Sequence, residues 1–182
     1  MRSIDTRLEG PILIEPAVHG DARGFFLESY RANVWAQLGI DDVFVQDNHS
    51  RSGRGVLRGM HFAIGAGQAK LVRCARGTIL DVVVDLRRDS PTYGEWEAHE
   101  LDDERARQLY VSIGFAHGFC VLSETADVTY KCSTYYDGAV ERGFHYDDPE
   151  VGIEWPQDME LIVSQRDVDA PTLREIADGL PF

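Results

Sequence analysis

Short β-type runs separated by glycine, proline and aspartate turns recur along the chain, and this rhythm restricts the fold more than any other feature of the sequence. Clear examples are an edge-like ILIE strand within Pro11–Pro16, FFLESY over Phe25–Tyr30 and TILDVVVDL over Thr78–Leu86. Helical spacing is confined to Arg31–Leu38 and Pro171–Ala177. Repeated short strands with so little helix predict an all-β barrel or a double-sheet jelly roll with short peripheral helices.

The order of the runs also suggests which strands are neighbours. Glu95–Leu101 and Arg107–Ser112 are joined by a charged DDERA segment, and Gly118–Ser123 and Asp127–Cys132 flank a short turn. We therefore expect each of these two couples to form a strand pair. The SQRDVDAPTL stretch near the C-terminus is typical of a loop.

Size and charge limit the class of protein. A chain of 182 residues fits a single domain spanning residues 1–182. The net charge of −13 argues against nucleic acid or an anionic membrane as a partner, because both require a basic face. A small anionic ligand held by a local cationic cluster remains compatible with this charge.

The cysteines and the absence of long apolar runs bear on location. Cys74, Cys120 and Cys132 form no CxxC or zinc pattern, and each lies in an apolar or alternating run. We interpret them as small buried residues in a reducing compartment. With no secretory leader and no apolar run that could span a membrane, we expect a cytoplasmic protein.

The stretch from Phe44 to Gly77 carries the strongest functional signal. Two β-type runs, Phe44–Asn48 and Val56–His61, flank an SRSGRG segment that we predict to be a turn. In VLRGMH, strict alternation would place Arg58 and His61 on opposite faces of a strand. A bulge or twist at Gly59 could bring both side chains to one cavity. Lys70 follows within a β-type run, where a lysine is atypical unless it reaches solvent or serves a site. An imidazole, a guanidinium and an amine this close together indicate a functional site.

Several motifs together resemble one known family. They run in order from about residue 11 to about residue 173 and read GDARGFFLESY, FVQDNHSRS, VLRGMHF, AKLVRCARG, DVVVDLRRDSPTYGEW, QLYVSIGFAHGF, YKCSTYY, and EWP followed by SQRD. The chain resembles the dTDP-4-dehydrorhamnose 3,5-epimerases, which are cupin-type isomerases of nucleotide-sugar metabolism. The resemblance implies a cupin-type jelly roll, a homodimer with exchanged edge strands, and catalysis without a metal or other cofactor.

The residues around His61 independently argue against a metal centre. Cupin metal sites commonly use a His-x-His pair, a later carboxylate and a distant histidine. Here Ala63 follows His61 and offers no ligand atom, while Lys70 stands near the expected carboxylate and would repel a divalent cation. His61 and His117 alone make a poor ligand set.

The resemblance implies a role for each catalytic side chain. Epimerisation beside a ketone needs a base, an acid across the ring, and a cation that stabilises the enolate oxygen. By resemblance the base is His61, oriented by Asp167, the acid is Tyr130, and Lys70 stabilises the enolate. The alternatives are purely structural roles. His61 would be a hydrogen-bonded core histidine, Tyr130 would close the barrel, and Asp167 would be an ordinary loop aspartate.

The resemblance also implies the residues that bind the nucleotide sugar. Arg58 would hold the diphosphate, and Arg23, Phe26 and Glu28 would reach the nucleotide from the neighbouring subunit. The remaining polar lining implied by the resemblance is Gln46, Asn48, His117 and Tyr136. Core packing is the alternative for Phe25 and Phe26. Alternation points only one of them inward, so the other remains available for the nucleotide.

The expected activity is conversion of dTDP-4-dehydro-6-deoxyglucose to dTDP-4-dehydro-L-rhamnose by inversion at C3 and C5. Family members usually have Gln at Ala63 and Pro at Ser112, so inversion at C3 alone, or another nucleotide-sugar substrate in a specialised deoxysugar pathway, also fits. A ketoisomerase, a metal-dependent cupin oxygenase and a non-catalytic sugar-binding cupin remain as further alternatives.

Overall fold

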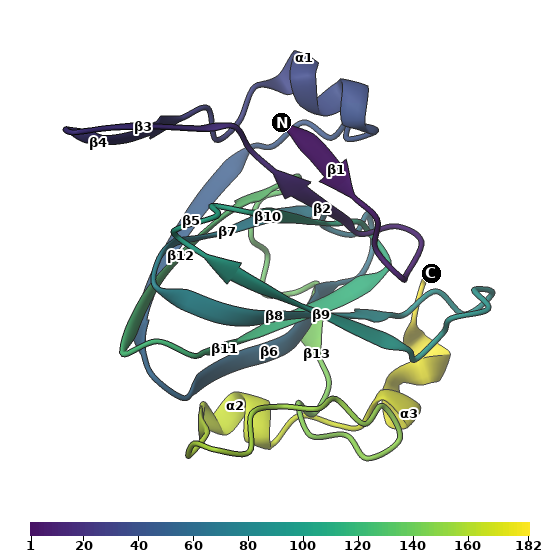
Figure 1. Cartoon of the computed structure of the whole chain (residues 1–182). Helices are drawn as coiled ribbons and strands as arrows, with labels where there is room; N and C mark the ends of the chain where they lie inside the picture. Colours follow the sequence, from purple (N-terminus) through teal and green to yellow (C-terminus); the bar gives the residue numbers. More distant parts are fainter.

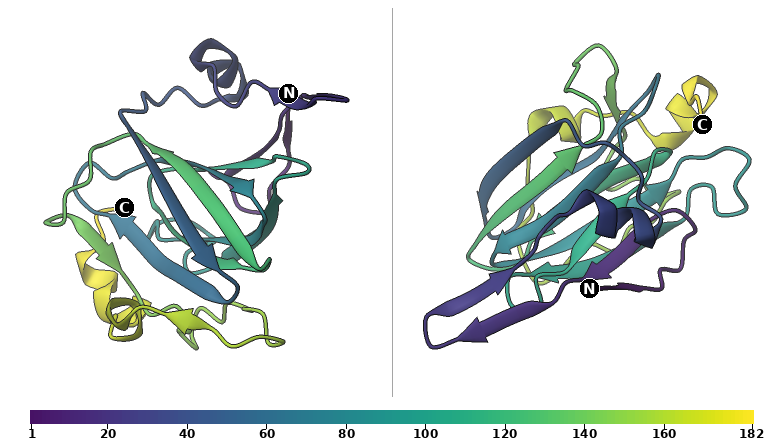
Figure 2. Two further views of the ribbon diagram at one scale, coloured as in Figure 1. Left: turned by 90° about the vertical axis from the view of Figure 1, so that its left-hand side faces the viewer. Right: turned by 90° about the horizontal axis from the view of Figure 1, so that it is seen from above.

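The computed structural model describes residues 1–182 and contains two large β-sheets that face each other across the molecule (Figures 1 and 2). The first sheet has the strand order β1 (Arg2–Ile4), β2 (Ile12–Glu15), β10 (Gln108–Val111), β7 (Lys70–Arg76), β12 (Thr125–Cys132) and β5 (Gln46–Gly53). The second has the order β13 (Glu141–Gly143), β6 (Val56–Ala63), β11 (Phe115–Val121), β8 (Thr78–Asp85) and β9 (Trp96–Asp102), and β14 (Ile162–Val163) also pairs with β6. This is the double-sheet jelly roll that the sequence predicts.

Helices are few and short, as the sequence predicts. They are α1 (Ala32–Trp35), α2 (Gln165–Val168) and α3 (Leu173–Ile176), with 3-10 turns η1 (Ala36–Leu38) and η2 (Ala177–Gly179). Gly39 ends the first helical segment in the left-handed conformation, at φ 87°. A capping box between Thr172 and Glu175 starts α3. None of these helices is long and apolar enough to cross a membrane.

The expected strand pairs are wrong, although the strands themselves are present. β9 pairs with β8, and β10 pairs with β2 and β7, so the DDERA segment crosses from one sheet to the other. In the same way β11 pairs with β6 and β8, while β12 pairs with β5 and β7. From β5 to β12 every strand except β9 lies in the other sheet from the strand before it, and the local sequence does not encode this alternation.

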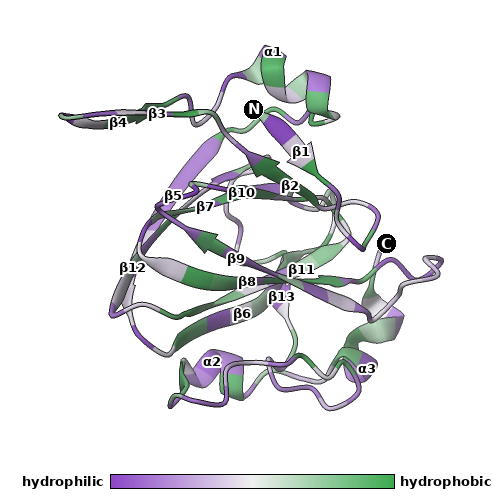
Figure 3. Cartoon of the chain, in the orientation of Figure 1, coloured by the Kyte–Doolittle hydropathy of each residue, from purple (hydrophilic) through white to green (hydrophobic).

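Two further strand predictions need correction. The ILIE strand β2 lies between β1 and β10 and is therefore internal, because the first residues of the chain pair with it. Strand β5 continues to Gly53, through residues that the sequence predicts as a turn. Its polar side chains hide the alternation, and Figure 3 shows β5 as a largely hydrophilic strand.

Apolar side chains fill three regions around the two sheets. The interior cluster between the sheets includes Val72, Ile79 and Phe119. The C-terminal segment covers the outer face of the second sheet with residues such as Trp155, and the α1 segment covers part of the first sheet with Trp35. All three cysteines are buried and free, as predicted.

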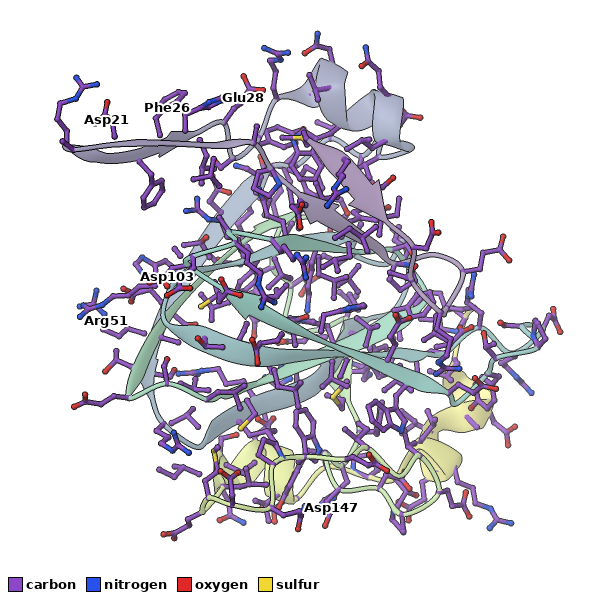
Figure 4. The ribbon with its side chains drawn as sticks, viewed as in Figure 1. Asp21, Phe26, Glu28, Arg51, Asp103 and Asp147 are labelled. Carbon is purple, nitrogen blue, oxygen red and sulfur yellow. The ribbon has the colours of Figure 1, made fainter.

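A two-stranded hairpin, β3 (Val18–Asp21) and β4 (Gly24–Leu27), forms its own small sheet and projects away from the barrel (Figures 1 and 4). Phe25 is 57% exposed and Phe26 is 71% exposed. The alternative of core packing is therefore excluded for both residues within the isolated chain, because the hairpin has no sheet of this chain beneath it.

The turn after β8 is built on the buried carboxylate of Asp85. It accepts hydrogen bonds from Arg87, from the Ser90 hydroxyl at 2.6 Å and from the Thr92 hydroxyl at 2.7 Å. Burial alone would raise the pKa of Asp85, but these hydrogen bonds lower it to about 2.

We predict that Asp85→Asn destabilises the protein at neutral pH by about 2 kcal/mol. The folded-state pKa lies below the unfolded value, so this stabilisation is present above the unfolded pKa of about 4 and disappears as the pH falls towards 2. Urea unfolding at about pH 7 and about pH 3 measures it. The difference between wild type and variant should shrink at the lower pH. Asp89→Asn, an exposed neighbour, should leave stability unchanged at both; an equal loss in both variants would contradict this role.

Candidate active site

A bulge in β6 brings Arg58 and His61 to the same side of the sheet. On β11, Phe119 is opposite Arg58 and His117 is opposite His61, so three steps on β6 match two on β11. The extra residue on β6 shifts the inward–outward alternation of side chains by one position. Arg58 and His61 therefore line the same cavity. The bulge that the sequence suggests at Gly59 is confirmed.

Two glycines allow the bulge to pack against its neighbour. Gly59 has φ 147°, and a Cβ there would lie 2.6 Å from the Cα of Gly118 on β11. A Cβ on Gly118 would in turn lie 2.7 Å from the sulfur of Met60. The close approach of these backbones therefore requires glycine on both strands.

His61 is paired with a buried carboxylate. Its Nε2 lies 2.7 Å from Oδ1 of Asp167, whose side chain is 6% exposed. Burial alone would raise the pKa of Asp167, but hydrogen bonds from His61, from Ser164 and from the Gly59 backbone lower it below its ordinary value. With Nε2 engaged by an ionised carboxylate, the other ring nitrogen of His61 is left for a substrate.

Asp167 sits on a helical turn, whereas the sequence predicts a loop there. Ser164 caps α2, and its side chain accepts a hydrogen bond from the backbone amide of Asp167. This cap fixes the carboxylate beside β6, with which α2 is in contact. The serine three residues before the aspartate was the available sequence signal.

Lys70 and Tyr130 enter the same cavity from the opposite sheet, on β7 and β12. Burial lowers the pKa of Lys70, and the nearby acidic groups Cys132, Glu141 and Asp81 only partly oppose this. The Lys70 amine makes no hydrogen bond or ion pair within the chain. Burial also raises the pKa of Tyr130, which keeps its phenol protonated.

Strand β5 supplies a polar row to the interior. Gln46 and Asn48 hydrogen bond to each other at 3.0 Å, and Ser52 accepts two hydrogen bonds from the guanidinium of Arg58. The hydroxyl of Ser50 is buried in the cavity wall and has no partner. Sequence reasoning found Gln46 and Asn48 but not the two serines, which it placed in a turn.

A second histidine–aspartate pair, His117 with Asp81, lies beside the first. Nε2 of His117 is 3.0 Å from both carboxylate oxygens of Asp81, which is fully buried. Sequence reasoning named His117 and missed Asp81. Asp81 is a charged residue in the middle of the apolar run TILDVVVDL, and this unusual position is the sequence signal that could have identified it.

The cavity lined by Arg58, His61, Lys70, His117, Tyr130 and Asp167 has a volume of about 470 Å³. Gln46 and Asn48 are not among its walls, and Asn48 lines a neighbouring cavity instead. Glu141 and Arg166, which the sequence did not single out, also line it and form an ion pair at 3.3 Å. Tyr136 lies just outside, in a small adjoining cavity that shares Lys70 and Glu141 as walls.

The structure does not bring Arg23, Phe26 and Glu28 to this cavity. They lie on or beside the projecting hairpin, where Figure 4 labels Phe26 and Glu28. Arg23 pairs with Asp21 of the same hairpin, and Glu28 pairs with Arg31. Within one chain these residues therefore form a separate group.

Fold and cavity together define a cupin-type jelly roll whose interior is equipped for proton transfer, with a histidine–carboxylate pair facing a tyrosine and a lysine. The family model described as dTDP-4-dehydrorhamnose 3,5-epimerase matches residues 5–175. The chain belongs to this family.

Individual relatives are similar to this chain over almost its whole length. The dTDP-4-dehydrorhamnose 3,5-epimerase of Methanothermobacter thermautotrophicus is 48% identical, over 96% of this chain and 95% of its own. The crystal structure of a Legionella pneumophila dTDP-6-deoxy-D-glucose-3,5-epimerase in complex with dTDP-4-keto-L-rhamnose has a TM-score of 0.96 at 46% identity, covering 99% of this chain and 97% of that one. The dTDP-4-dehydrorhamnose 3-epimerase of Streptomyces niveus is 46% identical, over 98% of this chain and 87% of its own.

We predict that Gly59→Ala lowers the free energy of unfolding by about 1–3 kcal/mol, because the new methyl group collides with Gly118 and φ 147° disfavours a side chain. Chemical denaturation measures the change. Gly179→Ala is the matched control, since a Cβ there meets nothing within 4 Å. Equal stability of the Gly59 variant and wild type would show that the strands can separate without cost.

Proposed function

We propose that this chain epimerises dTDP-4-dehydro-6-deoxyglucose at C3 and C5, giving dTDP-4-dehydro-L-rhamnose through enolate intermediates and without a cofactor. The observation that carries the proposal is the pairing of His61 with Asp167 in a cavity that also holds Lys70, an amine without a partner in the chain. Family membership supports the substrate class, and a relative of very similar structure was solved with dTDP-4-keto-L-rhamnose.

His61 acts as the base in this mechanism. The free ring nitrogen takes the proton from the carbon next to the C4 ketone, and Asp167 holds the ring in the required tautomer and stabilises the imidazolium that forms. The short contact of 2.7 Å and the lowered pKa of Asp167 favour an ionised partner for that imidazolium.

Tyr130 and Lys70 complete the proton transfer from the other sheet. Tyr130 faces the cavity from β12, so it can deliver a proton to the face of the sugar opposite His61. Lys70 stabilises the negative charge on the C4 oxygen. An ammonium group at this position takes the place that a metal cation would need, and Ala63 adds no ligand, so we propose catalysis without a metal.

Substrate binding uses the polar lining around the catalytic groups. Arg58, exposed at the cavity and held by Ser52, offers a planar guanidinium to the diphosphate. Gln46, Asn48, His117 and Tyr136 contact the remainder of the substrate in this proposal. The backbone amide of Tyr136 donates to Gln46 at 2.9 Å, which ties its loop to β5.

We further propose a homodimer in which the β3–β4 hairpins are exchanged. The hairpin pairs with no other strand of its own chain, and its two phenylalanines are exposed. Seated on a second copy, Arg23, Phe26 and Glu28 would reach the nucleotide in that copy's cavity. The buried free cysteines suit a reducing compartment, and we place the enzyme in the cytoplasm.

Inversion at C3 alone is the second candidate. The Streptomyces niveus 3-epimerase is as similar to this chain as several 3,5-epimerases are. Proton NMR of dTDP-4-dehydro-6-deoxyglucose with the protein in D₂O separates the two. Deuterium at both carbons supports the double epimerase, deuterium at C3 alone supports the second candidate, and no deuterium at either carbon contradicts both.

We predict that His61→Ala abolishes deuterium exchange at both carbons and leaves dTDP affinity nearly unchanged, because the imidazole acts on the sugar. Exchange by NMR and dTDP binding by calorimetry measure the two effects. Arg58→Ala is the matched variant with the opposite pattern. It should raise KM and weaken dTDP binding by about tenfold or more while exchange still occurs. Persistent exchange in His61→Ala would refute the base assignment.

We predict that the activity of a mixed dimer distinguishes hairpins exchanged between subunits from hairpins that serve their own subunit. One subunit carries His61→Ala and the other carries Arg23→Ala with Phe26→Ala, with a different affinity tag on each. If hairpins are exchanged, one site collects all three changes and the other has none, so the purified mixed dimer keeps about half of the wild-type kcat. If each hairpin serves its own cavity, both sites are defective and the mixed dimer is nearly inactive.

A further inference from the structure

A row of titratable side chains crosses the inner face of the second sheet. Four adjacent strands of this sheet each contribute one member, namely His61 from β6, His117 from β11, Asp81 from β8 and His99 from β9, and Glu97 on β9 is the fifth and last member. The mechanism proposed above uses His61 as base and gives no role to Asp81 or His99.

The first half of the row starts at the base. His117 is directly opposite His61 in the strand register, so their side chains share a face with Cβ atoms about 5 Å apart. His117 then hydrogen bonds to Asp81 at 3.0 Å. A proton on the free nitrogen of His61 therefore has an imidazole beside it and a buried carboxylate behind that.

The second half continues to the far side of the sheet. His99 is directly opposite Asp81 in the register and therefore lies on the same face. Its Nε2 is buried, makes no hydrogen bond, and lies 3.1 Å from Oε1 of Glu97 without the alignment of a hydrogen bond. A buried ring nitrogen without a hydrogen bond is rare in an interior that serves packing alone.

Glu97 connects the row to a second cavity, distinct from the catalytic one. This cavity has a volume of about 950 Å³ and lies along β9, with Arg7, Trp96 and Leu173 among its walls. The catalytic cavity contains the His61 end of the row, and the second cavity contains the Glu97 end.

We propose that this row is a proton relay that connects His61 to solvent in the second cavity while substrate fills the catalytic cavity. The proposal rests on the proposed function, because the proton concerned is the one that His61 removes from the sugar. His99 and Glu97 are its outer members and do not touch the substrate.

The transfers conserve protons and charge. The imidazolium of His61 gives its proton to the free nitrogen of His117, directly or through one water, and His117 releases the proton of Nε2 to the Asp81 carboxylate. Asp81 passes it to His99, and His99 passes it through Glu97 to water in the second cavity. The reverse sequence delivers a solvent proton to His61, and no other reactant is required.

A structural role accounts for Glu97, whose carboxylate oxygens accept hydrogen bonds from the backbone amides of Arg7 and Leu8, but it does not account for His99. Asp81 already has His117 as its hydrogen-bonding partner, and its charge also acts on Lys70 across the barrel. His99 is not needed to satisfy Asp81, yet it is opposite Asp81 in the strand register and its buried Nε2 lies 3.1 Å from Glu97. Its place in the row is that of a carrier between two carboxylates.

The relay is tested by following deuterium into unreacted substrate. Protein and dTDP-4-dehydro-6-deoxyglucose are mixed in D₂O, stopped at low conversion, and examined by proton NMR. In wild type, His61 acquires deuterium and returns some of it to the face it came from, so the recovered substrate is labelled. His99→Gln removes the carrier, and the label in recovered substrate per product formed should fall several-fold while KM stays unchanged.

Glu97→Gln is the second variant and should lower the same ratio, and His145→Gln, a histidine outside the row, should not. An unchanged ratio in both row variants would overturn the relay, and so would an equal fall of labelling and product formation. Wild-type enzyme that forms product while its recovered substrate stays unlabelled would also overturn it. A wild type that neither labels nor inverts the sugar would instead overturn the proposed function.

Discussion

The close approach of β6 and β11 at Gly59 and Gly118 is the constraint on which the site depends. Because a side chain at either position would collide with the neighbouring strand, the bulge can form only with glycine on both. The bulge moves His61 to the face that Arg58 occupies and places the Gly59 backbone amide at Asp167. One backbone irregularity therefore sets both the direction of the His61 side chain and part of the hydrogen bonding of Asp167.

The electrostatics of the cavity follow from burial more than from the total charge. The chain carries a net charge of −13, yet the cavity receives Arg58 and Lys70 together with a protonatable histidine. Burial lowers the pKa of Lys70 and raises that of Tyr130, so the amine is made more acidic and the phenol is kept protonated. The proposed base, acid and stabilising amine thus differ mainly in which sheet presents them and in how deeply they are buried.

Local sequence predicts the strands well and their partners badly. Runs such as TILDVVVDL identify β8 because alternation and flanking turns are local properties. The pairing of β9 with β8 and of β10 with β7 depends on contacts between distant segments, so neighbouring runs were wrongly paired. Within the site, family motifs led to His61, Lys70, Tyr130 and Asp167. Asp81 was missed because its relevance to the site comes from its hydrogen bond with His117, which lies on another strand.

In the proposed mechanism, the arrangement of the two sheets lets the two proton-transfer groups act on opposite faces of one sugar. His61 belongs to the second sheet and Tyr130 to the first, and the interior cluster of Val72, Ile79 and Phe119 packs between the same two sheets. The separation of His61 and Tyr130 is therefore fixed by core packing, which yields little to small forces. If these two groups are base and acid as proposed, a sugar held between them presents its opposite faces to different sheets, and inversion then follows from the architecture of the barrel.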